Sequence, residues 1–267
     1  MKVKLIAMTP NPIDVMWTAA RTCYSSKGPI DMWDETRDVP KDEYKEEIED
    51  KRWNLVKKVL DSGHCSITEH VYFTFAIEGV TRTLLAQLTR HRAGIVFSVQ
   101  SQRYVEIKED ISLFERRNYM SEDYLNNKEL IEILDKYFEW DHLDYPQFHM
   151  LMNAMYAYLY QTREGVKPED ARQILPNCTK TNITMSVNLR ELMHICNLRL
   201  CTRAQDEIRT LFGIIKVAVN RENDKLAKLL VPTCEVNNVC YEGKCCGRRP
   251  HISKVIEGYK ENRYGSK

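Results

Sequence analysis

The chain has 267 residues, of which 43% are hydrophobic, and its 39 Lys and Arg balance 38 Asp and Glu. This size and composition fit one large globular domain or two small ones, and they exclude an intrinsically disordered chain. A formal net charge of +1 supplies no general field for a polyanion, so an affinity for phosphate must come from local clusters of cations.

No apolar run approaches the roughly 20 residues that span a bilayer, so the sequence predicts no membrane partner. Lys4 and the Thr9-Pro10-Asn11-Pro12 segment leave the first apolar stretch too short for a secretory signal, and we expect a cytoplasmic protein. The nine cysteines are odd in number and no export signal accompanies them, so we expect free thiols, with one possible exception at the C-terminus.

Apolar periodicity and capping residues predict the elements in chain order. Asn11 and Thr81 are expected to cap helices, and Pro12 to occupy the first helical position. The predicted helices in this part of the chain cover 12–23, 41–61, 82–88 and 127–137. The predicted strands cover 3–8, 71–77 and 97–105. Residues 28–40 are expected to form a loop, and 106–146 an excursion of charged and aromatic residues.

The second part of the chain continues the alternation of helices and strands. Asn188 with Glu191 three residues later has the spacing of a capping box, which predicts a helix after Asn188. Other helices are predicted over 148–162, 168–175 and 203–230, and a strand over 179–187. The pattern favours the α+β class, with a main domain over 1–233 and a Cys-rich basic tail over 234–267.

Two segments lack acidic residues and contain several arginines. Between Glu78 and Glu106 there is no Asp or Glu, and a second acid-free stretch covers 172–190. The arginines of the first segment are Arg82, Arg90, Arg92 and Arg103, and Arg199 and Arg203 follow the second. Arginine makes bidentate hydrogen bonds to phosphate and keeps its proton, so these segments predict anion recognition. The alternative for any one arginine is an ordinary surface pair with a carboxylate.

The triplet Arg90-His91-Arg92, followed by Ser101-Gln102-Arg103-Tyr104, resembles the signature of the flavin-dependent thymidylate synthases. The resemblance extends in order over residues 3–230. It includes Gly63-His64, Glu69-His70, Phe73-Thr74-Phe75, Gln87, Arg172 before Ile174-Leu175-Pro176, Asn188-Leu189-Arg190 and Arg199. Eight residues separate Arg92 from Ser101 where the family pattern has seven. Ser101 is favoured over Gln100 for the serine position, because the motif continues directly after Ser101. Val99 stands where some relatives have an acidic residue.

The resemblance implies a fold and a reaction. The fold would be a central twisted, mainly antiparallel sheet with long flanking helices. The reaction would convert dUMP to dTMP with methylene-tetrahydrofolate as carbon donor, FAD as hydride carrier and NADPH as reductant, in a homotetramer whose subunits share active sites. By position, the residues implied to hold FAD are Ser66, Arg90, His91, Arg92, Asn188, Arg190 and His194. Those implied to hold dUMP are Gln87, Arg90, Ser101, Gln102, Arg103, Arg172 and Arg199.

The resemblance also implies catalysis without a protein nucleophile. In the cysteine-dependent thymidylate synthases the nucleophilic cysteine is followed by histidine, and no cysteine of this chain is. Ser101 has no adjacent base in the sequence. Arg199 is the candidate catalytic residue, because a permanent cation at the uracil edge favours the N3-deprotonated form.

Two other functional classes stay open at this point. The arginine segments could belong to a nucleic-acid-binding or nucleotide-binding module without catalysis. The tail holds Cys234, Cys240, Cys245 and Cys246, with His251 beyond them, and could form a zinc-stabilised interaction domain. Because the tail lacks paired C-x-x-C spacing, and His64 and His70 lack a third ligand at sensible spacing, we predict no metal at either place.

Overall fold

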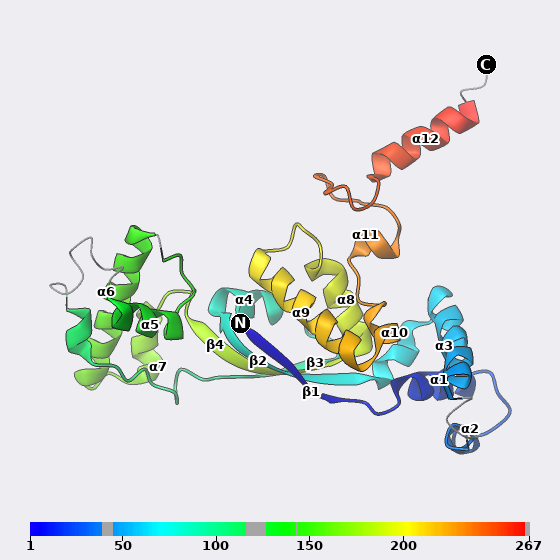
Figure 1. Ribbon diagram of the computed structural model, residues 1–267, viewed down its shortest axis with the longest axis horizontal. Helices are drawn as coiled ribbons and strands as arrows, with labels where there is room; N and C mark the ends of the chain where they lie inside the picture. Colours follow the sequence, from blue (N-terminus) through cyan, green and yellow to red (C-terminus); the bar gives the residue numbers. More distant parts are fainter. Residues whose placement is uncertain (39–44, 116–126, 143, 265–267) are drawn as a thin grey trace. The chain divides into compact units, whose positions relative to one another are not determined.

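The computed structural model of the chain describes residues 1–38, 45–115, 127–142 and 144–264 (Figure 1). Contacts between Cα atoms divide the chain into two compact units. Unit one comprises residues 1–2, 77–90 and 97–184, and unit two comprises 3–76, 91–96 and 185–267. The predicted boundary after residue 233 falls inside unit two and stays a prediction.

Four strands form one sheet. They are β1 (Lys2–Met8), β2 (Tyr72–Thr81), β3 (Ile95–Val99) and β4 (Lys180–Asn188), paired in the order β1-β2-β4-β3. The pairing of β2 with β4 is antiparallel, since Thr74 bonds Ser186 while Gly79, further along β2, bonds Asn182. Every second residue of β2 from Phe73 to Ile77 is buried, as the alternation predicts. Sheet and helices together confirm the α+β class and the antiparallel sheet.

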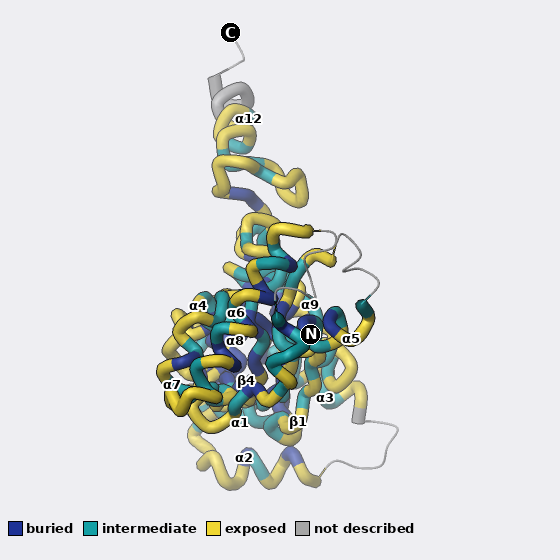
Figure 2. Tube along the Cα trace, turned by 90° about the vertical axis from the view of Figure 1, so that its left-hand side faces the viewer, coloured by how far each residue is buried: buried dark blue, intermediate teal, exposed yellow. Residues whose placement is uncertain are grey.

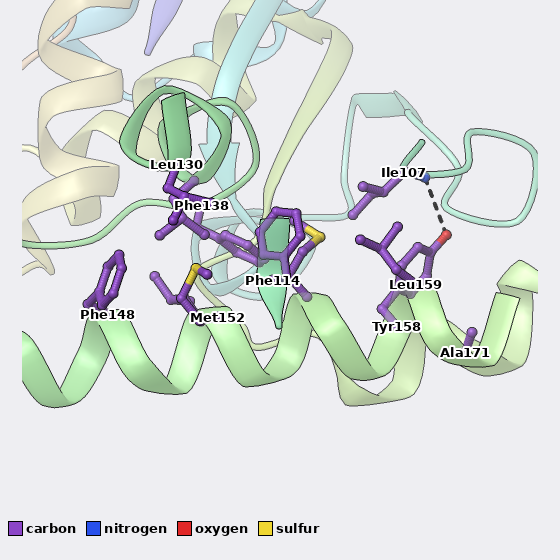
Figure 3. Packing of buried hydrophobic residues seen from close by; sticks show 12 residues of the cluster. Ile107, Phe114, Leu130, Phe138, Phe148, Met152, Tyr158, Leu159 and Ala171 are labelled. Atoms are coloured by element: carbon purple, nitrogen blue, oxygen red, sulfur yellow. Dashed lines mark hydrogen bonds between the residues drawn. The ribbon is translucent and has the colours of Figure 1, made fainter. Parts of the chain in front are cut away.

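Unit one contains an apolar core built largely on α6 (Tyr145–Arg163). Phe148, Met152, Met155 and Leu159 follow one another at helical spacing on one face of this helix, and the core buries them (Figure 3). The Tyr158 hydroxyl accepts a hydrogen bond from the backbone N–H of Ile107 (3.3 Å), which ties the start of the 106–146 excursion to α6. The other helices of this unit are α4 (Arg82–Leu88), η3 (Ile111–Phe114), α5 (Lys128–Tyr137), α7 (Pro168–Ala171) and η6 (Arg172–Ile174).

Unit two contains most of the remaining helices. They are α1 (Pro12–Thr22), α2 (Pro29–Glu35), α3 (Lys45–Asp61), η2 (Cys65–His70), α8 (Leu189–Arg199), α9 (Asp206–Glu222), α10 (Asp224–Ala227), α11 (Thr233–Val236) and α12 (Ile252–Tyr264). Leu192 and Ile195 of α8 are fully buried, as are Leu211 and Ile215 of α9, whereas α2 and the start of α12 are mostly exposed (Figure 2). In the described residues, no helix is long and apolar enough to cross a membrane.

Two of the predicted capping residues have the expected geometry. The Thr81 hydroxyl accepts a hydrogen bond from the backbone N–H of Leu84 (3.0 Å), and the Asn188 side chain accepts one from Glu191 (2.9 Å). Asn11 precedes α1 as predicted, but it adopts a left-handed conformation (φ 47°), and its side chain makes no cap hydrogen bond among the described residues.

Three predicted elements were wrong. Residues 28–40 are not all loop, because α2 begins at Pro29; its single buried residue, Met32, leaves no apolar period to detect. The strand predicted to reach 105 ends at Val99, because the Ser101 hydroxyl accepts the backbone N–H of Arg103 in a turn. The helix predicted over 203–230 is two helices, since Asn223 is extended and caps α10 through Leu226 (3.0 Å).

Candidate functional site

The imidazole of His91 lies in unit two between a cation and a carboxylate. His91 is only 7% exposed, and two residues of α8, Glu191 and Arg199, lie against its ring. Arg199, the last residue of α8, donates its Nε–H to His91 Nε2 at 3.2 Å, and Glu191 Oε1 lies 3.5 Å from His91 Nδ1. Since Nε2 accepts a hydrogen bond, the proton of the neutral ring must be on Nδ1, where it faces the carboxylate.

Burial first, and then the nearby Arg199 and His194, lower the pKa of His91 from 6.5 to about 4. Burial also raises the pKa of Glu191, while His194 acts on that carboxyl in the opposite direction. At neutral pH the ring is therefore uncharged. Arg199 is a permanent cation that a neutral acceptor holds in place, so its charge is not cancelled at that contact.

Gly94 brings the segment after the arginine triplet against the start of α8. The Asn188 backbone N–H donates to the Gly94 carbonyl at 2.8 Å. Gly94 has a φ of 65°, and a Cβ at this position would lie 2.2 Å from Asn188 Nδ2. Only glycine fits this approach, because a side chain would meet both a steric clash and an unfavourable backbone conformation.

The residues implied to hold FAD lie in unit two, with one exception. The Leu189 N–H donates to the Val71 carbonyl at 2.7 Å, and Arg190 forms an ion pair with Glu69, so η2 lies beside the first turn of α8. The members of the set in this unit are Ser66, His91, Arg92, Asn188, Arg190 and His194. Arg90 belongs to unit one, because the boundary between the units falls inside the triplet.

The residues implied to hold dUMP fall in unit one, apart from Arg199. Arg103 Nε lies 2.6 Å from Glu169 Oε2, and Arg172 Nε donates to the Glu169 carbonyl at 3.0 Å. Glu169 therefore holds both guanidinium groups. The remaining members of the set in this unit are Gln87, Arg90, Ser101 and Gln102.

A cavity of about 320 Å³ in unit one is lined by Ser101 and Gln102 and also by Arg82 and Thr181. Thr181 is 2% exposed, and its Oγ1 is buried with no hydrogen-bond partner among the described residues. Arg82 Nε is also buried with no hydrogen-bond partner among the described residues, although Arg82 Nη2 donates to the Gln100 carbonyl at 3.2 Å. Burial, and then the nearby Arg172, lower the pKa of Arg82. Unpartnered buried polar atoms that line a cavity are places where a ligand can complete the hydrogen bonding.

Sequence reasoning missed Glu191, Arg82 and Thr181. Glu191 stood only as a helix-capping residue, and Arg82 was noted in the first acid-free segment without a role. No local spacing could have singled out Thr181, because its burial depends on strand pairing. The alternative of ordinary surface pairs holds in part, since Arg103 and Arg190 do pair with carboxylates.

Nine cysteines are free thiols, as predicted. Within residues 1–38, 45–115, 127–142 and 144–264, no three Cys, His, Asp or Glu side chains are placed to hold a metal ion.

Comparison with known proteins identifies the family. The family model described as thymidylate synthase complementing protein matches residues 4–222. The flavin-dependent thymidylate synthase of Clostridium tetani is 35% identical over 258 residues, which cover 95% of this chain and 96% of the relative. The flavin-dependent thymidylate synthase of Haloarcula marismortui is 32% identical, and the match covers 95% of this chain and 100% of the relative.

A solved structure has the same fold. The flavin-dependent thymidylate synthase of Helicobacter pylori, complexed with FAD and dUMP, superposes with a TM-score of 0.63. Its sequence is 23% identical, and the match covers 86% of this chain and all of that one. The triplet, the residues grouped around α8 and the extent of these matches lead to one conclusion: the chain belongs to the family of flavin-dependent thymidylate synthases.

Proposed function

We propose that the protein converts dUMP to dTMP by reductive methylation. Methylene-tetrahydrofolate would donate the carbon, FAD would carry the hydride and NADPH would supply the electrons. The observation that supports this most directly, beyond family membership, is Arg199, a permanent cation held by a neutral, buried His91. Such a preorganised charge is what stabilisation of an electron-rich pyrimidine requires.

The residues around the start of α8 fit a dinucleotide. Arg92 and Arg190 are exposed cations, and His194 adds a ring donor on the next turn of the same helix. With Ser66, Asn188 and the Gly94 backbone, they offer charged and neutral donors of the kind that bind a diphosphate. We infer that these residues, with His91 and Arg90, hold FAD. When bound there, FAD would supply hydride to the methylene carbon.

The cavity in unit one fits part of dUMP. Ser101 and Gln102 line it, and Arg103 and Arg172 are held close together by Glu169. We infer that Arg82 and Thr181 belong to this site, because their buried polar atoms need partners that the described residues do not provide. Hydrogen bonds from charged donors to a phosphate contribute about 1.5–3 kcal/mol each, so three or four suffice for micromolar binding.

Arg199 would act on the pyrimidine ring by favouring the N3-deprotonated, enolate-like form, which raises electron density at the carbon that accepts the methylene group. His91 would be a positioning residue, because its Nε2 fixes the direction of the Arg199 guanidinium. Glu191 would in turn fix the tautomer of His91.

No side chain of the protein would form a covalent bond to the pyrimidine. The Ser101 hydroxyl oxygen already accepts the Arg103 backbone N–H at 3.2 Å, which leaves its proton to donate to the nucleotide. Gln87, in α4, would contribute an amide to the same ligand.

The proposed sites are completed in a homotetramer. The residues implied for dUMP are divided between unit one and, for Arg199, unit two. In the family, subunits share active sites, so Arg199 of one copy would serve the nucleotide held by another. We also propose that the protein acts in the cytoplasm and binds no nucleic acid.

Purification provides a direct test. Flavin absorbance near 450 nm should accompany the protein or return when FAD is added, and dUMP should perturb that spectrum. A colourless protein that does not bind added FAD, and that instead binds DNA or RNA with steep salt dependence, would contradict the proposal.

A further inference from the structure

The C-terminal part of unit two gathers thiols that the proposed reaction does not use. The thiol cluster comprises Cys201, Cys234, Cys240, Cys245 and Cys246. All but Cys245 line a cavity of about 290 Å³, together with Thr202 and Arg248. Cys240 also pairs with His251 in an isolated parallel bridge.

Cys246 is exposed, and its surroundings favour the thiolate. The backbone N–H of Arg248 and the Thr202 hydroxyl donate to its sulfur, and the Arg248 guanidinium lies nearby; these contacts lower the pKa of Cys246. Arg248 is itself held in place, because its Nη1 lies 3.5 Å from Glu235 Oε1.

Cys234 is the complementary thiol. It lies in α11, lines the same cavity and interacts electrostatically with Cys246. Burial raises the pKa of Cys234, so it stays protonated where Cys246 ionises. An exposed thiolate beside a protonated neighbour is the arrangement of an attacking and a resolving thiol.

Two other interpretations of the cluster are less well supported. A metal site would need three or more ligands in place, and the described residues offer no such group. Cys240 and Cys245 hydrogen-bond each other, but Cys240 is buried, so a soluble reagent reaches Cys246 first.

We propose that Cys246 is a site of thiol–disulfide exchange with low-molecular-weight disulfides, and that Cys234 resolves the mixed disulfide. The Cys246 thiolate attacks one sulfur of the reagent; a protein–reagent disulfide forms, the reagent's own S–S bond breaks, and the departing thiolate takes a proton from water. Cys234 then releases its proton to water, and its sulfur attacks Cys246. The second reagent thiolate leaves and is protonated. Two protein thiols are oxidised and one disulfide is reduced to two thiols.

The test uses the full chain, reduced and then exposed to glutathione disulfide at pH 7 for varied times. Trapping with an alkylating agent and peptide mass spectrometry give the modification rate at each cysteine. Cys23 is the matched control, because it is also exposed but lies at the end of α1 with its thiol directed to the Ala19 carbonyl. We expect Cys246 to react about tenfold faster than Cys23, because the donors around the Cys246 sulfur favour its thiolate.

Variants separate the two steps. Cys246→Ser should abolish the fast modification, Cys234→Ser should leave the mixed disulfide at Cys246 without further reaction, and Cys23→Ser should change neither rate. In the unmodified chain the product should be a Cys234–Cys246 disulfide. Equal rates at Cys23 and Cys246, a Cys240–Cys245 product, or protection of the whole cluster by one equivalent of added Zn²⁺ would overturn the proposal.

Discussion

Arg199 donates its Nε–H to His91 Nε2 at 3.2 Å, and this bond joins two residues 108 positions apart in the chain. The bond matters because it fixes the orientation of the guanidinium. Glu191 Oε1 lies 3.5 Å from the opposite ring nitrogen, which carries the proton of the neutral ring. The contact therefore supports the role proposed for Arg199 and gives His91 a role through it.

Replacement of Arg199 by Ala should lower turnover at saturating dUMP by about a hundredfold or more. Loss of one preorganised charge partner removes about 3 kcal/mol of barrier stabilisation. Arg199→Lys should recover only part of this, since lysine keeps the charge but has no planar Nε–H to donate to His91. Steady-state dTMP formation measures the effect, and the exposed Arg221 on α9 provides the matched control as Arg221→Ala. Near-normal turnover in Arg199→Ala would refute the role.

Stability should fall as the pH is lowered from about 6.5 to about 4. The pKa of His91 is about 4 in the folded protein and 6.5 ordinarily, so within this window the unfolded chain binds more protons. At about 1.4 kcal/mol per pKa unit, the loss is at most about 3 kcal/mol. The raised pKa of Glu191 acts in the opposite direction.

Comparison with His91→Gln isolates the histidine, because Glu191 remains in both proteins. Urea unfolding at pH 7 and pH 5 should show a larger loss of stability in the unmodified protein than in the variant. The same loss in both would show that His91 does not titrate as its burial requires.

Arg82→Gln should weaken dUMP binding about tenfold to a hundredfold. The guanidinium is expected to contribute about 1.5–3 kcal/mol to holding the anionic ligand, and calorimetric titration with dUMP measures the change. Lys108→Ala is the control, because that side chain is 82% exposed and does not line the cavity around Ser101. If binding is lost equally in both variants, the cavity is not the nucleotide site.

Thr181→Val separates a ligand role from a structural one. Valine has nearly the same shape but no hydroxyl, so the ligand-free protein should be as stable or more stable, because an unpartnered buried oxygen is removed. Binding of dUMP should nevertheless weaken. A stable variant with unchanged dUMP affinity would place Thr181 outside the site.

Gly94→Ala should destabilise the protein by about 2 kcal/mol or more and abolish flavin retention. The added Cβ would clash with Asn188, and the φ of 65° is unfavourable for alanine. Gly213→Ala, in α9 with no atom within 4 Å of the added Cβ, should instead stabilise by about 0.5–1 kcal/mol. Thermal unfolding and flavin absorbance of the purified variants report both effects. If Gly94→Ala retained as much flavin as the unmodified protein, the proposed FAD site beside Gly94 would be contradicted.

The elements with a local chemical signal were predictable. Thr81 and Asn188 cap helices because their side chains accept backbone N–H groups three residues later, and both positions could be read from sequence. The break at Asn223 was missed, since the apolar period continues on both sides of it and only the side-chain cap separates α9 from α10. The short α2 was missed for lack of a buried face.

The candidate site was predictable where a cation or a motif marked it, and unpredictable where a contact depended on folding. Arg199 and His91 were identified, but the bond between them was not, because no spacing rule connects residues 108 positions apart. Glu169 and Glu191 were missed for the same reason. Each becomes a partner only when strands and helices distant in sequence pack together.

The most direct test of the central claim is anaerobic dTMP formation by the FAD-loaded protein reduced with NADPH and mixed with dUMP and methylene-tetrahydrofolate. We predict about one dTMP per bound flavin in a single turnover, and the same yield from a variant in which Cys23, Cys178 and Cys201 are replaced by serine. Absence of dTMP, or a product that disappears with these thiols, would contradict a mechanism that depends on Arg199 and on no protein nucleophile.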